Sequence, residues 1–132
     1  MHDPFVSVSI TINSSREVVW NYLTTQENWE KWYGSGRLLE VNPAWEPGAI
    51  LRFESGQKAK ITACASPEII RFAGYSISLS ALDSATTKVE YRFEPDHFFA
   101  SDPSLMEGFI RDYTPLVEAR LGILKRLVEA DT

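Results

Sequence analysis

"SSREVVWNYLTTQENWEKW", residues 14–32, predicts two short helices that meet at a corner. Ser14 is the expected N-cap of the first helix, because Glu17 follows three residues later and the two side chains can form a capping box. The buried side of that helix is expected to consist of Val19, Trp20 and Leu23. Two threonines then interrupt the helical pattern, and Trp29 and Trp32 lie three residues apart on the second helix. The stretch therefore predicts a helical corner with tryptophans on both arms.

Alternating apolar and polar residues on either side of this corner predict a sheet. Residues 6–12 alternate between branched apolar side chains and Ser or Thr, which is typical of a strand with one buried face. Six more strand-like runs follow the corner, at residues 37–42, 49–55, 57–65, 69–73, 75–82 and 87–94. The links between them are short, so the strands are expected to pair antiparallel.

Beyond residue 102 the apolar residues recur at steps of three and four, which predicts a long C-terminal helix. The apolar stripe consists of Met106, Ile110, Tyr113, Val117, Leu121, Leu124 and Val128. Asp102 before Pro103 is the expected cap. Pro115 lies inside the pattern and is expected either to kink the helix or to restart it with Thr114 as a new cap.

Length and composition predict a single domain over residues 1–132. The net charge is −5 and the Lys and Arg residues are scattered, so a nucleic-acid partner is not expected. Cys64, His2 and His97 lack metal-ligand spacing, and we expect no metal and no other cofactor. No apolar run is long enough to insert into a membrane, and residues 1–12 do not resemble a signal peptide. With the lone thiol, this pattern favours the cytoplasm.

Three stretches resemble the START-like, or helix-grip, superfamily (SRPBCC): the corner quoted above, "WEPGAILRF" at 45–53 and "SPEIIRFAGY" at 66–75. They are most similar to the polyketide cyclase/dehydrase branch and to the branch named for an activator of the heat-shock-protein-ninety ATPase. The resemblance implies an α+β helix-grip fold. In that fold a curved antiparallel sheet of about six or seven strands wraps around the long C-terminal helix, and two short helices lie between strands one and two. It also implies a cavity between sheet and helix, in which members bind lipids, hormones or aromatic polyketides.

The strand pattern predicts which side chains face such a cavity. Along each strand, side chains at alternate positions face opposite sides of the sheet. Leu39 and the other apolar residues are expected to point inward, and the alternate positions carry mixed charges typical of a solvated face. Four inward positions are small, namely Ala59, Ala63, Ala65 and Ala81. Small side chains leave volume that a ligand can occupy, or that Phe109, Tyr113 or Leu116 of the helix can fill.

No catalytic residue is expected from this pattern. No Asp, Glu or His falls on an inward strand position, and a general acid or base must point into the site. His97 lies in a loop, where an exposed histidine is the simpler interpretation. Cys64 shares the polar parity of its strand and has no activating neighbour in sequence.

The expected ligand contacts combine aromatic side chains with one small inward residue. They are Trp32, Tyr33, Phe53, Ala63, Tyr75, Tyr91, Phe109 and Tyr113. Trp32 and Tyr33 are expected at the entrance, whereas Trp20 is expected to be a core anchor. A buried tyrosine hydroxyl needs a hydrogen-bond partner in the protein, in water or in a ligand.

The function expected from these observations is the binding of a small, largely apolar or aromatic molecule between the sheet and the C-terminal helix. A cyclase/dehydratase-like enzyme, in which a tyrosine or His97 moves a proton, is the first alternative. A chaperone-associated protein-interaction module is the second. A homodimer is compatible with all three.

Overall fold

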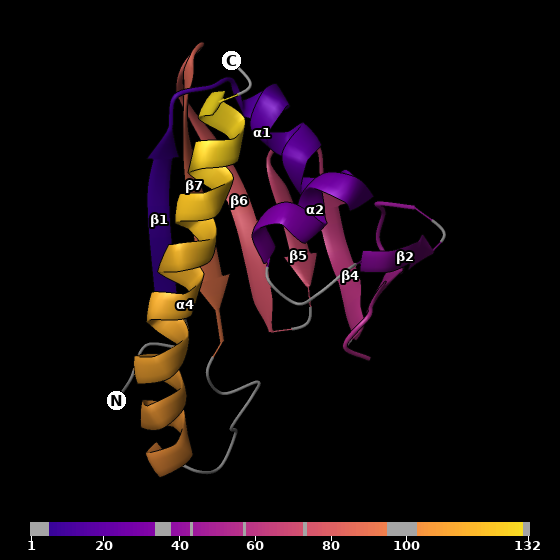
Figure 1. Cartoon of the computed structure of the whole chain (residues 1–132), viewed down its shortest axis with the longest axis vertical. Helices are drawn as coiled ribbons and strands as arrows, with labels where there is room; N and C mark the ends of the chain where they lie inside the picture. Colours follow the sequence, from indigo (N-terminus) through magenta and orange to yellow (C-terminus); the bar gives the residue numbers. More distant parts are fainter. Residues whose placement is uncertain are drawn as a thin grey trace.

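The computed structural model describes residues 6–33, 38–42, 44–56, 58–72, 74–94 and 103–130. Within these ranges the chain forms seven strands and three helices (Figure 1). In chain order they are β1 (Val6–Ile12), α1 (Arg16–Leu23), α2 (Gln26–Tyr33), β2 (Leu38–Asn42), β3 (Ile50–Phe53), β4 (Lys58–Ala65), β5 (Ile69–Phe72), β6 (Tyr75–Asp83), β7 (Thr86–Phe93) and α4 (Pro103–Ala130). The predicted α+β class and the predicted order of elements are confirmed.

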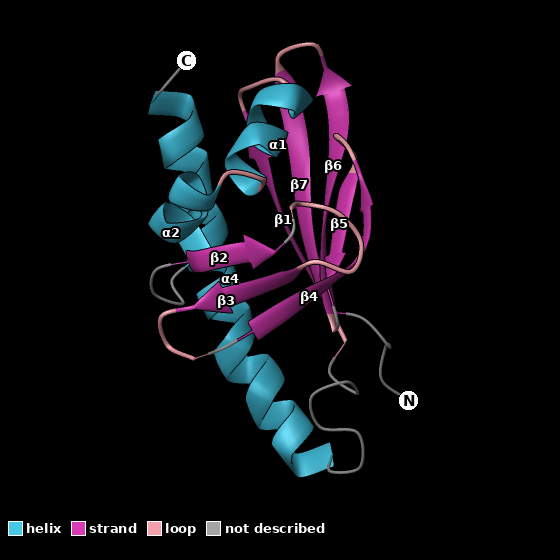
Figure 2. Ribbon diagram, turned by 90° about the vertical axis from the view of Figure 1, so that its right-hand side faces the viewer, coloured by secondary structure: helices cyan, strands magenta, loops and turns pink. Residues whose placement is uncertain are grey.

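The strands form one antiparallel sheet in the order β1-β7-β6-β5-β4-β3-β2. Short connections join neighbouring strands from β2 to β7, as the turn residues predicted. Strand β1 is the edge strand beside β7 and pairs with it along its whole length. Figure 2 shows β2, β3 and β4 turned across the direction of β1, β6 and β7. The sheet is therefore curved, and its concave side receives the helices.

Helix α4 lies along β1, while α1 and α2 cover the same side of the sheet near the C-terminal end of α4 (Figures 1 and 2). In both views the N-terminal half of α4 extends past the ends of the strands. The C-terminal half carries the buried part of the predicted stripe: Val117, Leu121, Leu124 and Val128. Each such side chain contributes roughly 1.5–3 kcal/mol when it is fully buried. No helix in the described ranges is both long and apolar enough to cross a membrane.

The N-cap of α1 is Ser15, so the prediction of Ser14 is wrong by one residue. The Ser15 hydroxyl accepts a hydrogen bond from the Val18 amide at 3.4 Å. Ser14 is buried instead, and its carbonyl accepts a hydrogen bond from the Thr87 hydroxyl of β7 at 2.8 Å. This tertiary contact holds residue 14 against the sheet, one position before the helix begins.

Irregularities in the strand register overturn part of the predicted inward set. The register shifts between Leu38 and Glu40, and Leu38 becomes buried while Leu39 is 47% exposed. Ala65 and Ala81 are exposed as well, so two of the four small inward positions are lost. Ala81 lies before the register shift on β6, and it is exposed with the rest of that end of the strand. A bulge changes which face the following residues occupy, because the side-chain period of a strand is two.

Cys64 also departs from its predicted position, since it packs against the core instead of facing solvent with the charged parity. A further register shift, between Ile61 and Ala63 on β4, accounts for the change. The same shift leaves Ala63 half-buried.

Burial of Trp20 and Trp32 is the reverse of the prediction, and the sequence left the position of Trp29 undecided. Trp29 is completely buried and Trp32 is 1% exposed, whereas Trp20 is only partly buried at the margin of the core. Helix α2 contacts α1, α4 and β2, so it is covered on several sides. Trp32 is therefore a core side chain, and the prediction that it lies at an exposed entrance is wrong.

Pro115 lies within the continuous helix α4, which does not restart at Thr114. In a regular helix the amide of residue 115 would bond to the carbonyl of Arg111, and proline has no such amide. Both Arg111 and Pro115 are exposed, so water can satisfy that carbonyl. The predicted cap Asp102 lies outside the described residues.

Candidate ligand-binding site

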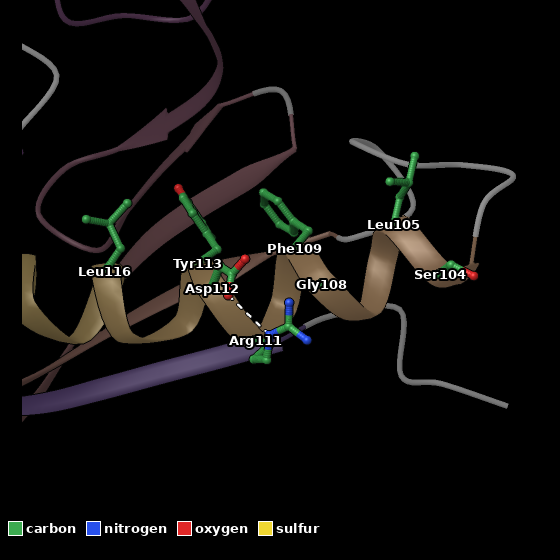
Figure 3. A pocket seen from close by; sticks show the side chains of 8 residues that line it. All are labelled: Ser104, Leu105, Gly108, Phe109, Arg111, Asp112, Tyr113 and Leu116. Carbon is green, nitrogen blue, oxygen red and sulfur yellow. Dashed lines mark hydrogen bonds and ion pairs between the residues drawn. The ribbon is translucent and has the colours of Figure 1, made fainter.

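A hollow of about 600 Å³ lies along the N-terminal half of α4 (Figure 3). We call it the α4 hollow. Its described lining comes from one helix and consists of Ser104, Leu105, Gly108, Phe109, Arg111, Asp112, Tyr113 and Leu116. Two of the predicted contact residues, Phe109 and Tyr113, are in this set. The hollow follows the part of α4 that extends past the strands.

The apolar wall of the hollow is a second stripe of α4, distinct from the stripe buried in the core. Figure 3 shows Leu105, Phe109, Tyr113 and Leu116 projecting from the same side of the helix. Leu105 is 56% exposed and Leu116 is 45% exposed, which is unusual for leucines grouped on one helical face. The sequence prediction missed Leu105 and treated Leu116 only as a filler. The spacing of residues 105, 109, 113 and 116 by three and four could have predicted this second apolar face. Tyr113 also belongs to the stripe predicted for the core, which made the second face harder to recognise.

Tyr113 links the hollow to the sheet. Its hydroxyl lies 2.7 Å from the hydroxyl of Tyr91 on β7, a buried side chain. The Tyr113 ring also stacks on Phe109, with centroids 4.7 Å apart, and meets Phe93 edge-on at 4.9 Å. Tyr91, Phe109 and Tyr113 were predicted as ligand contacts and Phe93 as an inward position, and the fold brings the four rings from β7 and α4 together.

Further ring contacts extend from Tyr91 into the core. Tyr75 stacks on Tyr91 at 5.4 Å and on Phe72 at 4.7 Å. Phe72 in turn lies 5.9 Å from Trp29, which meets Trp32 at 4.9 Å. Trp32 and Tyr75 thus belong to a continuous aromatic series that ends at Tyr113, but neither of them lines the α4 hollow. Trp29, which links Phe72 to Trp32 in the series, was not predicted as a site residue.

The remaining predicted contacts lie elsewhere. Phe53 on β3 is buried in the core, and Ala63 on β4 is half-buried; neither belongs to the described lining of the hollow. The side chain of Tyr33 and the whole of His97 lie outside the described residues.

The hollow has one charged edge, formed by Arg111 and Asp112. Arg111 Nε donates to Asp112 Oδ1 at 3.2 Å, and the two side chains are 78% and 75% exposed. An ion pair this exposed contributes little to stability. Arg111 and Asp112 therefore place charges at the margin of the site, and neither is a buried acid or base.

The described residues provide little for nucleophilic or metal chemistry. Burial raises the pKa of the Cys64 thiol, whose Sγ lies 3.7 Å from the Trp45 carbonyl oxygen. A thiol with a raised pKa stays protonated at neutral pH and is a poor nucleophile. Within the described ranges, no three His, Cys, Asp or Glu side chains gather where they could hold a metal ion.

Comparison with known proteins identifies the fold. No protein-family model and no curated protein matches this sequence. Among solved structures, the Aha1 dimer from Colwellia psychrerythraea is 19% identical, with a TM-score of 0.70 over 95% of this chain and 96% of that chain. The AHSA1-like protein from Aeromonas hydrophila is 14% identical, with a TM-score of 0.62 over 96% and 94% of the two chains.

DynU16, a protein in the dynemicin biosynthetic locus, is 16% identical with a TM-score of 0.71. The match covers 99% of this chain and 49% of DynU16, so this chain corresponds to about half of that protein. These likenesses confirm the resemblance seen in the sequence at the level of fold. The chain has the START-like helix-grip fold, a curved antiparallel sheet with a long C-terminal helix on its concave side.

Proposed function

We propose that this protein binds a small, largely apolar or aromatic molecule in the α4 hollow. The observation that carries the proposal is the half-exposed apolar stripe of Leu105, Phe109 and Leu116 along a hollow of about 600 Å³. Small-molecule sites typically measure about 300–1,000 Å³ and are lined mainly by apolar and aromatic groups. A ligand here would remove apolar surface from water, at roughly 25 cal/mol per Å².

The Tyr91–Tyr113 pair supports the same proposal by supplying a polar group beside the apolar wall. Tyr113 lines the hollow, and its position is held by Tyr91 and by its stack on Phe109. A ligand hydroxyl or carbonyl next to Tyr113 would then have a fixed partner that sets its orientation. The proposal keeps Tyr33, Phe53, Ala63, Tyr75 and Trp32 as contacts predicted from the sequence, and none of them belongs to the described lining of the hollow.

The cyclase/dehydratase alternative draws on the short Tyr91–Tyr113 hydroxyl distance, because a hydroxyl pair can relay a proton. It is the weaker candidate, since the one carboxylate in the described lining, Asp112, is exposed and paired with Arg111. We further propose a cytoplasmic location. A homodimer is compatible with the likeness to the Aha1 dimer.

The test uses methyl naphthoate, a neutral aromatic probe, with protein labelled at the leucine methyl groups. Binding in the hollow predicts chemical-shift changes at Leu105 and Leu116 and none at Leu82, an exposed leucine at the far end of β6. Phe109→Ala is expected to weaken affinity about tenfold or more because it removes a ring from the wall. Leu82→Ala is the matched control. Unchanged affinity in Phe109→Ala, or shifts confined to other leucines, contradicts the proposal.

Native mass spectrometry of protein purified from its own host complements this probe. A copurifying small molecule that is absent from Phe109→Ala would identify the natural ligand. A copurifying protein in place of a small molecule would favour the interaction-module alternative.

A further inference from the structure

The charged edge and the aromatic wall of the α4 hollow come from neighbouring turns of the same helix. Figure 3 shows the Arg111 guanidinium turned along α4 toward Gly108, whereas the ring of Phe109 projects from another side of the helix. Arg111 Nη2 lies 3.7 Å from the position that a Cβ on Gly108 would occupy. Glycine at this position leaves the helix surface open around the guanidinium. A positive charge and an aromatic face are thus presented to the same hollow.

The ion pair of Arg111 uses only part of its hydrogen-bonding capacity. Its Nε donates to Asp112, and within the described ranges Arg111 makes no other hydrogen bond or ion pair. Glu107, one turn earlier on α4, forms no ion pair with it among the described residues. The two terminal nitrogens therefore have no protein acceptor there, and together they match the two oxygens of a carboxylate.

We propose that the natural ligand of the α4 hollow is an aromatic or alicyclic carboxylic acid. Its ring contacts Phe109 and the exposed leucines, and its carboxylate pairs with the terminal nitrogens of Arg111. Asp112 keeps its hydrogen bond to Arg111 Nε, and its negative charge opposes the binding of a second carboxylate at the same guanidinium. The inference rests on the proposed function, since it specifies the chemical class of the molecule bound in that hollow.

Isothermal titration calorimetry with naphthoic acid and its methyl ester, at neutral pH and low salt, tests this inference. The two probes share a ring system and differ in charge. The acid is expected to bind about two- to fivefold more tightly than the ester, which is the range for an ion pair open to solvent. Raising the salt concentration should narrow the difference because the site is open to solvent.

Three variants locate the charge that selects the acid. Arg111→Gln should abolish the preference for the acid, so that the acid and the ester bind this variant with similar affinities. Asp112→Asn should strengthen binding of the acid because it removes the competing carboxylate. Arg126→Gln, an exposed arginine at the far end of α4, is the matched control and should change neither affinity.

The possible outcomes separate this inference from the proposed function. Equal binding of acid and ester, both sensitive to Phe109→Ala, overturns the inference and leaves the proposed function standing. A preference for the acid that survives Arg111→Gln also overturns it. Absence of binding by either probe overturns both. Circular dichroism verifies that the exposed substitutions leave the fold intact.

Discussion

The hydroxyl oxygens of Tyr91 and Tyr113 lie 2.7 Å apart and join the buried strand β7 to the first half of α4. The two residues are 22 positions apart in the chain. Their contact is made where α4 leaves the core and begins to line the hollow. It therefore couples the position of the candidate site to the packing of the sheet.

Removing one hydroxyl of this pair should lower stability modestly. Tyr113→Phe and Tyr91→Phe are each expected to reduce the free energy of unfolding by about 0.5–1.5 kcal/mol. Because both remove the same interaction, the double variant should lose less than the sum of the two single losses. Urea denaturation of the four proteins measures the coupling. Strictly additive losses would show that the two hydroxyls do not interact in solution.

Truncation of the tryptophans should follow their burial. Trp32→Ala is expected to reduce the free energy of unfolding by about 3–5 kcal/mol, because its ring is fully buried against Trp29. Trp20→Ala should be less damaging, since that ring is only partly buried. Thermal unfolding of both variants gives the comparison, and a larger loss for Trp20→Ala would contradict the arrangement described here.

Thr114→Val should leave stability unchanged or raise it by up to about 1 kcal/mol. The Thr114 hydroxyl oxygen is buried and has no hydrogen-bond partner among the described residues. Valine has nearly the same shape and removes the unsatisfied polar atom. Thr114→Ser, which keeps the hydroxyl and loses the methyl group, is the control and should be destabilising. A marked loss in Thr114→Val would mean that the hydroxyl is bonded in solution.

Glu129 connects the C-terminal end of α4 to the turn after β1. The Asn13 amide and the Lys125 Nζ each donate to Glu129 Oε2 at 2.8 Å. The hydrogen bond from Asn13, followed by that from Lys125, lowers the pKa of the Glu129 carboxyl below its usual value. The carboxylate therefore contributes stability above the ordinary glutamate pKa of about 4.3, and this contribution is lost as the pH falls through the lower folded value.

Glu129→Gln should accordingly be less stable than the wild type near neutral pH, and the difference should shrink as the pH falls below about 4. Melting temperatures across the acid range measure this difference. Glu118→Gln, on the exposed side of the same helix, is the control. A difference between wild type and Glu129→Gln that is constant with pH would count against the hydrogen-bonded carboxylate.

Much of the fold was predictable because the apolar repeat that identifies a strand or a helix is set by neighbouring residues. The strand alternation of residues 6–12 and the helical stripe through Val117, Leu121 and Leu124 are both confirmed. The errors occur where one distant contact or one bulge moved a residue. Ser14 is held by Thr87, and Leu39 was turned outward by the register shift beside it.

The candidate site was less predictable than the fold. Phe109 and Tyr113 were correctly placed on the long helix, but the sequence alone did not show that Leu105 and Leu116 stay half-exposed beside them. Whether an apolar helical face is covered depends on how far the sheet extends along the helix. That length is set by how the strands pair and curve in the folded sheet.

The amino-acid sequence by itself determined the elements, their order and their antiparallel pairing, because backbone propensity, turn residues and apolar period act over a few neighbouring positions. Only the tertiary structure decided that Trp32 is buried and that Tyr91 meets Tyr113. It also decided that the first half of α4 carries a half-exposed apolar stripe along a hollow. These features depend on the curvature of the sheet and on how far α4 extends beyond the ends of the strands. Neither property is encoded in a local sequence pattern.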